Sequence, residues 1–267
     1  MSYEPPATLS PSKVSAFKDC ALAFRFSVLD GLPQPPSLPA VRGTTVHRAL
    51  ELLFNEPAEL RTPEAARDHL STAFSEISAT EEFLALDLPE AESLRFQQDA
   101  ATMVGNYFTL EDPREVNVVG TELMIEAELD GVTIRGIIDR LEESPDGELI
   151  ISDYKTGRAP GVQQEQARME GIHFYSLLCE ETMGRRPATI RLIYLGREPQ
   201  IITAHPTEQS LRGTRRRLGA VWSAIDTACA NEDFRPRPSA LCNWCAYKDY
   251  CPAFGGDPRL ATRTSVH

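Results

Sequence analysis

Features that would place the chain in a special class are missing from its 267 residues. No apolar run approaches the roughly 18 residues that a membrane-spanning helix requires. The N-terminus also lacks a basic stretch followed by an apolar core. There is no internal repeat, and the proline-rich stretch GLPQPPSLPA is the one biased segment. We therefore expect a soluble, cytoplasmic globular protein with no membrane partner.

Positive charge is scarce, since 27 Lys and Arg residues face 39 Asp and Glu residues and the formal net charge is -12. The deficit is local, because residues 46–130 hold 5 basic against 19 acidic residues. The rest of the chain holds 22 basic against 20 acidic residues, with a cluster at Arg212, Arg215, Arg216 and Arg217. The acidic total therefore leaves room for a basic surface, although a charge run is more often a solvated helix face.

Cysteine is also limited, and six residues in a cytoplasmic chain of this size indicate thiols or metal ligands rather than a disulfide framework. Cys242, Cys245 and Cys251 follow a C-x2-C-x5-C pattern, and Cys20 could supply a fourth thiolate from the other end of the chain. No histidine follows the CxxC pair, which argues against haem attachment. Zinc and redox chemistry remain open.

The apolar spacing predicts helices and strands of an α/β protein. After a short helical lead, a helix capped by Thr44 or Thr45 is expected, with more helices near 63–79 and 89–110. Strands at 116–129, 132–143, 148–154, 188–195 and 199–205 and helices near 163–181 and 208–228 complete the order. This order favours a mixed central β-sheet flanked by helices. We expect one domain over 1–267, with a helical region at about 40–112, a core at about 113–230 and a cysteine-bearing segment at about 238–256.

The loop SPDGE at 144–148 predicts the pairing of two strands. Its Pro-Asp pair suits a type I turn, and Gly147 can take the left-handed position that follows. Counting back from the turn places Asp139 directly across from Asp153. Because side chains alternate, Lys155 shares their face. The same face also holds Ile137, Leu141, Leu149 and Ile151, so three charges are expected in an apolar setting.

Two facing carboxylates repel each other by an amount that a marginally stable fold must offset. At a separation of about 4 Å and an effective dielectric of about 20, the repulsion is on the order of 4 kcal/mol. Lys155 alone can pair with one acid. The arrangement is therefore either a buried ion-pair network or a site for a divalent cation, which would satisfy both acids.

The strand GIIDR, followed after a short gap by SDYKTG, resembles the PD-(D/E)XK nuclease superfamily, specifically its RecB-like exonuclease branch. The resemblance implies a restriction-endonuclease-like core with a helical N-terminal insertion. It also implies that Asp139 and Asp153 bind Mg²⁺ or Mn²⁺ and that Lys155 acts at the scissile phosphate of DNA.

Three further stretches extend the resemblance. RGTTVHRALE is similar to the family's upstream histidine motif, which would make His47 a metal ligand, although a helical histidine alone is more often structural. In the later helix Tyr175 matches a site tyrosine, but Gly171 stands where the family has glutamine, with Gln163, Gln164 and Gln166 as candidate substitutes. Glu122 falls where relatives often carry an acid, and a solvent-facing strand residue is the alternative.

The cysteine pattern resembles the iron-sulfur motif of AddB-type nucleases and Cas-associated exonucleases. The resemblance implies a 4Fe-4S cluster on Cys20, Cys242, Cys245 and Cys251 that clasps the two ends of the chain. Structural zinc on the same thiolates is the alternative.

The resemblance implies a metal-dependent DNA exonuclease that acts on single-stranded DNA or free ends in repair or recombination. No GxxxxGK[ST] loop is present, so coupling to unwinding would require a helicase or another repair protein as partner. The alternatives are a non-catalytic, cluster-bearing DNA-binding subunit of a repair complex and a zinc-stabilised nuclease acting on another nucleic acid, such as RNA.

Overall fold

The structure, a computed structural model, describes residues 3–159 and 162–261, with only the backbone described at 162–170 and 172. Its helices are α1 (Pro11–Asp19), α2 (Ala21–Phe24), α3 (Leu38–Phe54), α4 (Pro63–Ser78), α5 (Glu81–Leu84), α6 (Glu90–Tyr107), α7 (Val162–Met183) and α8 (Glu208–Asn231). Its strands are β1 (Val118–Leu129), β2 (Val132–Glu143), β3 (Leu149–Lys155), β4 (Thr189–Tyr194) and β5 (Gln200–Ala204). None of the described helices is both long and apolar enough to cross a membrane.

The strands form one five-stranded sheet in the order β1-β2-β3-β4-β5. β2 and β3 are antiparallel, β3 and β4 are parallel, and β4 and β5 are antiparallel. The parallel pair is connected by α7, as a parallel connection requires a crossover. The predicted α/β class with a mixed sheet and flanking helices is therefore confirmed.

The β2–β3 hairpin has the register that the turn predicted. Arg140 pairs with Ser152 and Leu141 with Ile151, which is the count expected from the loop. Gly147 has a φ of 79°, in the left-handed region that glycine occupies without a steric penalty. Its N–H donates to the carbonyl of Ser144 at 2.9 Å, which closes the turn.

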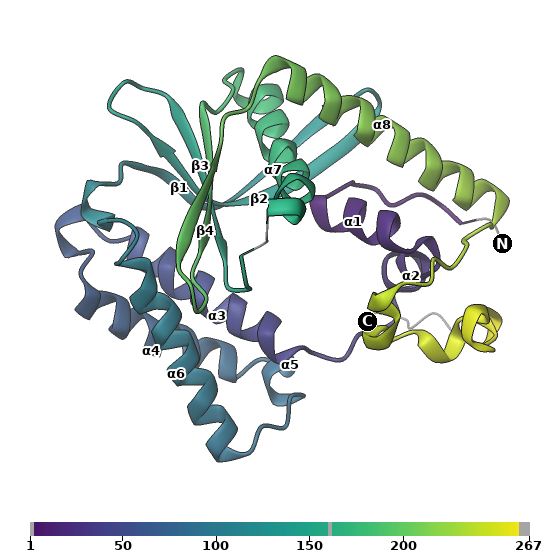
Figure 1. Ribbon diagram of the computed structural model, residues 1–267, viewed down its shortest axis with the longest axis horizontal. Helices are drawn as coiled ribbons and strands as arrows, with labels where there is room; N and C mark the ends of the chain where they lie inside the picture. Colours follow the sequence, from purple (N-terminus) through teal and green to yellow (C-terminus); the bar gives the residue numbers. More distant parts are fainter. Residues whose placement is uncertain (1–2, 160–161, 262–267) are drawn as a thin grey trace. The chain divides into compact units, whose positions relative to one another are not determined.

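The chain divides into two compact units, which we call the central unit (Pro36–Ile125 and Ile137–Glu208) and the terminal unit (Met1–Pro35, Glu126–Gly136 and Gln209–His267). In the central unit, α3, α4 and α6 pack together and cover one face of the sheet (Figure 1). Tyr154, Ile193 and Leu195 contribute the sheet side of this apolar cluster. The helical region thus supports the strand that carries the predicted site.

The start of α3 differs from the sequence prediction. The helix begins at Leu38, because the Ser37 side chain accepts the N–H of Ala40 and caps it. The prediction of a cap at Thr44 or Thr45 was wrong, since both lie inside the helix and donate their hydroxyls to the carbonyls of Ala40 and Val41. Inside a helix, a threonine hydroxyl can donate to the backbone carbonyl one turn earlier, so a threonine does not by itself mark the start of a helix.

The terminal unit has its own buried residues. Leu9 is fully buried and forms a parallel bridge with Ile134. The rings of Phe26 and Tyr247 lie 5.4 Å apart, and the Tyr247 hydroxyl donates to the Leu32 carbonyl at 3.1 Å. The bridge joins the N-terminal segment to β2, and the two contacts of Tyr247 join it to the cysteine-bearing segment.

Candidate metal-binding site

Asp139 lies near the end of the β2–β3 pairing, with its side chain only 11% exposed. Its Oδ2 accepts the backbone N–H of Tyr154 at 2.7 Å. Burial raises the pKa of Asp139 to about 6, and the nearby charge of Asp153 adds to the shift. The carboxyl group is therefore held in a place that disfavours its ionised form.

Asp153 and Lys155 lie two residues apart at the end of β3, so alternation puts them on one face. The ammonium group of Lys155 contacts Oδ2 of Asp153 as an ion pair. Burial works against the charged ammonium, but the charges of Asp153 and Asp139 outweigh it, and the pKa of Lys155 is raised. Lys155 thus stays protonated and keeps a fixed positive charge beside the acids.

His47 projects from α3 toward the same acids. Its Nε2 lies 3.0 Å from the carbonyl oxygen of Tyr154, and its Nδ1 lies 3.5 Å from Oδ2 of Asp139. Because a carbonyl can only accept, Nε2 carries the proton in this contact. In the neutral ring, Nδ1 then presents a lone pair to the acids, which is the arrangement that metal-binding histidines adopt.

Glu122 on β1 has an unusual backbone, with a φ of 44° in the left-handed region. Such a conformation costs a non-glycine residue about 1–3 kcal/mol and is concentrated at functional sites. Its Oε1 lies 4.0 Å from Nδ1 of His47. Burial raises the pKa of Glu122 to about 7, with further contributions from Asp139, Glu51 and Asp153.

His47, Glu122 and Asp139 offer ligand atoms that all lie within 4.8 Å of one another. Two carboxylates and an imidazole suit Mg²⁺ or Mn²⁺, and the raised pKa values show negative charge that a cation would offset. The predicted ligand Asp153 is not in this group and instead pairs with Lys155. Glu122, which the sequence left undecided, is in the group. Its match to a position where relatives often carry an acid was one signal for this role, and its left-handed backbone, which the sequence does not predict, is the other.

Tyr175 on α7 lies within electrostatic range of the site. Burial raises its pKa first, and the charges of Asp153, Asp139 and Glu122 raise it further. Gly171 is exposed, and open space surrounds the position that a side chain would take there. The candidate substitutes Gln163, Gln164 and Gln166 lie outside the described side chains.

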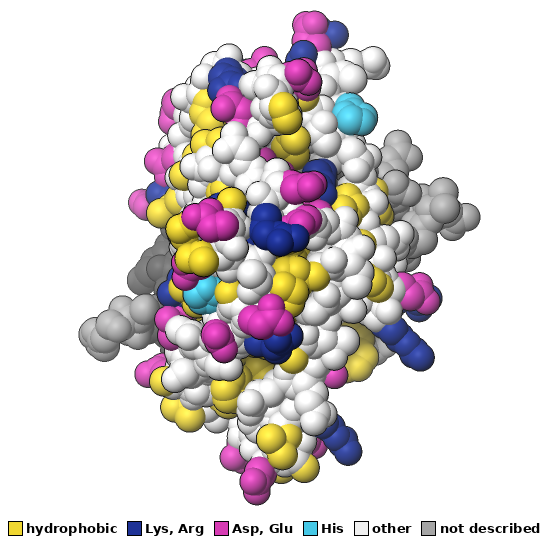
Figure 2. Space-filling view, turned by 90° about the vertical axis from the view of Figure 1, so that its left-hand side faces the viewer, with side chains coloured by type: hydrophobic (Ala, Val, Ile, Leu, Met, Phe, Trp, Pro, Cys, Tyr) yellow, Lys and Arg dark blue, Asp and Glu magenta, His cyan; other side chains and the backbone are white. Residues whose placement is uncertain are grey.

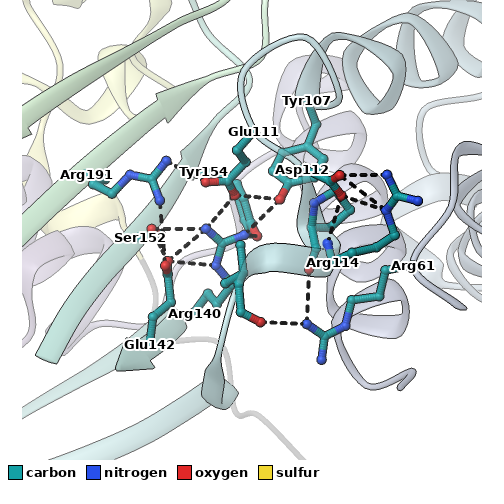
Figure 3. A network of polar contacts seen from close by, with 12 residues as sticks. Arg61, Tyr107, Glu111, Asp112, Arg114, Arg140, Glu142, Ser152, Tyr154 and Arg191 are labelled. Carbon is teal, nitrogen blue, oxygen red and sulfur yellow. Dashed lines mark hydrogen bonds and ion pairs between the residues drawn. The ribbon is translucent and has the colours of Figure 1, made fainter. Parts of the chain in front are cut away.

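The opposite face of β2 and β3 carries a second set of charges, shown in Figure 3. Arg140 is fully buried, and its guanidinium donates to Glu142 at 2.8 Å and to the Tyr154 hydroxyl at 2.8 Å, and pairs with Glu111 at 2.6 Å. It also contacts Tyr107 and Ser152. Arg191 pairs with both Glu111 and Glu142. Two cations therefore balance two anions, as buried charges require.

All six cysteines are free thiols. Cys20 Sγ accepts the backbone N–H of Arg237 at 3.5 Å, and Cys242 Sγ accepts that of Ser239 at 3.3 Å. Among the described residues, no group of three or more potential ligands includes a cysteine. The described residues therefore show no close cysteine group of the kind that holds a single ion, and the 4Fe-4S cluster or zinc on Cys20, Cys242, Cys245 and Cys251 stays a prediction.

The chain is similar to several known proteins. A family model for the PD-(D/E)XK nuclease superfamily matches residues 8–252. The gene 69 protein of Mycobacterium phage D29 is 25% identical over 266 residues, covering 92% of this chain and 96% of that protein. One component of the ATP-dependent helicase/deoxyribonuclease of Streptococcus agalactiae is 28% identical over 158 residues, covering 57% of this chain and 14% of that protein.

A solved structure is also similar. The crystal structure of a "Putative exonuclease" from Eubacterium rectale matches with a TM-score of 0.52 and 14% identity, covering 90% of this chain and 87% of that one. At this identity the match shows a shared fold. The five-stranded mixed sheet with flanking helices is accordingly consistent with a restriction-endonuclease-like core.

Proposed function

Because the chain belongs to the PD-(D/E)XK nuclease superfamily, we propose that it is a metal-dependent deoxyribonuclease that degrades single-stranded DNA from free ends. The observation that carries the proposal is the grouping of His47, Glu122 and Asp139 beside the Asp153–Lys155 ion pair. The names of the streptococcal and Eubacterium relatives support DNA as substrate and cleavage from an end. We extend the proposal to one nuclease domain over 1–267, because the family match draws on both units.

The roles follow from the charges of the side chains. His47, Asp139 and Asp153 hold Mg²⁺ or Mn²⁺ as the family pattern implies, and Glu122 adds a carboxylate. A bound divalent ion would lower the pKa of a ligated water and offset the charge of the phosphate. Lys155, kept protonated by its acidic neighbours, stabilises the negative charge that builds on the phosphate oxygens. Tyr175 shapes the wall of the site from α7.

The test is degradation of labelled DNA by the purified full-length chain during a Mn²⁺ or Mg²⁺ titration, comparing single strands, duplexes and blocked ends. We expect the metal-dependent loss of label from free single-stranded ends to vanish in Asp139→Asn and Lys155→Ala. Asp146→Asn is the matched control, because that carboxylate is exposed at the turn of the same hairpin. Unchanged degradation in the two site variants would reject the proposal.

The surface gives one constraint on DNA binding. Among the side chains coloured in Figure 2, acidic, basic and hydrophobic groups are intermixed, and Lys and Arg form no continuous patch on that face. That face therefore offers no extended basic surface for DNA phosphates. We also propose that the chain acts in cytoplasmic DNA repair or recombination. The name of the streptococcal relative supports a helicase as partner.

For the four-cysteine set we propose a 4Fe-4S cluster, with structural zinc as the alternative. The support is the motif and the backbone N–H groups that reach Cys20 and Cys242, since hydrogen bonds to sulfur stabilise thiolate ligands. Anaerobic purification should give a brown protein with iron and acid-labile sulfide. A colourless protein containing zinc and no iron would replace the cluster with zinc.

A second candidate function is a non-catalytic, cluster-bearing DNA-binding subunit. It is favoured by one observation, which is Gly171 in place of the family glutamine. It predicts DNA binding that survives Asp139→Asn and the absence of cleavage in any divalent metal. Cleavage by the wild-type chain would reject it.

A further inference from the structure

Tyr154 is a buried residue that connects the two faces of the sheet. On one side, its backbone N–H donates to Oδ2 of Asp139 at 2.7 Å, and its carbonyl oxygen lies 3.0 Å from Nε2 of His47. On the other side, its hydroxyl accepts from Nη1 of Arg140 at 2.8 Å. A single residue's backbone thus contacts two of the three grouped metal-ligating side chains.

The backbone pairing explains why this segment needs support. The β2–β3 register extends only as far as Arg140 and Ser152. Beyond that pair, the N–H and carbonyl of Tyr154 bond to side chains instead of to the β2 backbone. Asp139 and His47 therefore take their positions from the placement of the Tyr154 backbone.

The phenol of Tyr154 is well fixed. The side chain is 3% exposed and Arg140 is 0% exposed, and Arg140 is itself held by Glu142 and Glu111. Burial raises the pKa of Tyr154 above its usual range, so the group stays a neutral hydroxyl that can accept from the guanidinium. The phenol cannot move without breaking a buried charge-assisted hydrogen bond.

We propose that Tyr154 is a positioning residue, which Arg140 anchors on one face of the sheet so that its backbone holds Asp139 and His47 at metal-binding separation on the other. This rests on the proposed function, because it takes the His47, Glu122 and Asp139 group to be the ion site. Groups that orient metal ligands typically affect metal affinity by about 10- to 100-fold.

Tyr107 provides a matched control for the test. Its hydroxyl also accepts from Nη1 of Arg140, at 3.2 Å, and in addition donates to Oε1 of Glu111, but it lies on α6 and not on the strand that carries the site. Tyr154→Phe and Tyr107→Phe therefore remove the same chemical group from the same guanidinium. Only the first acts on the backbone segment that touches the ligands.

The experiment measures Mn²⁺ binding to the full-length wild type and both variants by titration calorimetry without DNA, together with thermal unfolding. We expect both variants to lower the unfolding midpoint. Tyr154→Phe should weaken Mn²⁺ binding by about tenfold, whereas Tyr107→Phe should change it less than about twofold.

The outcomes separate the two proposals. If the wild type binds Mn²⁺ and cleaves DNA but the two variants bind Mn²⁺ equally well, the positioning role is rejected and the proposed function stands. If the wild type binds no Mn²⁺, both are rejected. Should Tyr154→Phe not fold, 3-fluorotyrosine at 154 or 107 keeps each hydroxyl but weakens it as an acceptor, and the larger loss of affinity is again expected at 154.

Discussion

The two faces of the β2–β3 strand pair are formed by alternate residues of the same strands, but they differ in whether their buried charges are neutralised. On the face with Arg140 and Glu142, each buried charge has an opposite partner, completed by Glu111 and Arg191 from outside the pair. On the face with Asp139, burial and neighbouring acids raise carboxyl pKa values. We call the face with Arg140 the balanced face, because its buried charges neutralise one another. We call the face with Asp139 the unbalanced face, because a bound cation would be needed to offset the repulsion among its carboxylates.

The comparison separates stability from function. Breaking a balanced buried network exposes an uncompensated charge in a low-dielectric interior and destabilises the fold. Removing an acid from the unbalanced face relieves repulsion and should leave the fold intact. Variants on the face with Arg140 should therefore lose stability, whereas variants on the face with Asp139 should lose activity and keep their stability.

The largest expected effect is the loss of activity in Asp139→Asn. We expect metal-dependent DNA cleavage to fall at least about a thousandfold, equivalent to about 4 kcal/mol of transition-state stabilisation. The metal-free free energy of unfolding should stay the same or rise, because a buried carboxylate under repulsion is removed. Urea denaturation alongside the nuclease assay tests both, and a large loss of stability would contradict the contrast between the faces.

The next effect in size is the loss of stability in Arg140→Met. Leaving Glu111 and Glu142 short of a partner should lower the free energy of unfolding by about 3–5 kcal/mol. Arg135→Met is the control on the same strand, since Arg135 and Glu126 form an exposed pair, and it should cost less than about 1 kcal/mol. Equal losses of unfolding free energy in the two variants would show that the buried network contributes no more to stability than the exposed Arg135 and Glu126 pair.

The pH dependence of stability should also follow the unbalanced face. The pKa values of Asp139 and Glu122 are raised to about 6 and about 7, above those of the unfolded chain, so the folded state binds more protons between about pH 4 and pH 7. These groups therefore make the metal-free protein less stable as pH rises through that range. The difference between wild type and the double variant Asp139→Asn, Glu122→Gln reports the effect.

Saturating Mn²⁺ is the complementary arm of that measurement. An ion bound to the ionised carboxylates lowers their pKa values in the folded state below those of the unfolded chain. Stability should then rise with pH instead of falling. A wild type and double variant with parallel pH profiles in the absence of metal would show that the raised pKa values do not govern stability here.

The smallest expected effect is that of Gly171→Gln. The position is exposed on α7 with open space around it, so the change should stabilise the helix by about 0.5 kcal/mol through propensity alone. If the unbalanced face uses a glutamine from α7 as the family pattern implies, the rate of DNA cleavage should also rise. Thermal unfolding and the nuclease assay together distinguish the two contributions.

Much of the central unit was predictable because its signals are local. The turn at Gly147 and the period of two along each strand were enough to predict the register of the paired part, from Arg140 and Ser152 to Glu143 and Leu149. The Arg140 network was missed because its partners Glu111 and Arg191 come from distant segments. Nothing in their local sequence distinguishes them from solvated charges.

Other features were left undecided or misplaced for similar reasons. Glu122 joins His47 and Asp139 through a left-handed backbone that no turn residue announces. The start of α3 was misplaced because three residues near it, Ser37, Thr44 and Thr45, are all competent caps, and tertiary packing decides among them. The roles of the cysteines depend on a metal, which sequence spacing alone does not identify.

The strand pairing also restricts how the gene can change. Because the side-chain period is two, inserting or deleting one codon in the paired part of β2 or β3 would exchange the two faces, carrying Asp139 or Asp153 toward the Arg140 side. Point substitutions, in contrast, alter one face at a time. We therefore expect evolutionary variation in this hairpin to consist of substitutions within the strands, with length changes confined to the exposed loop at 145–148.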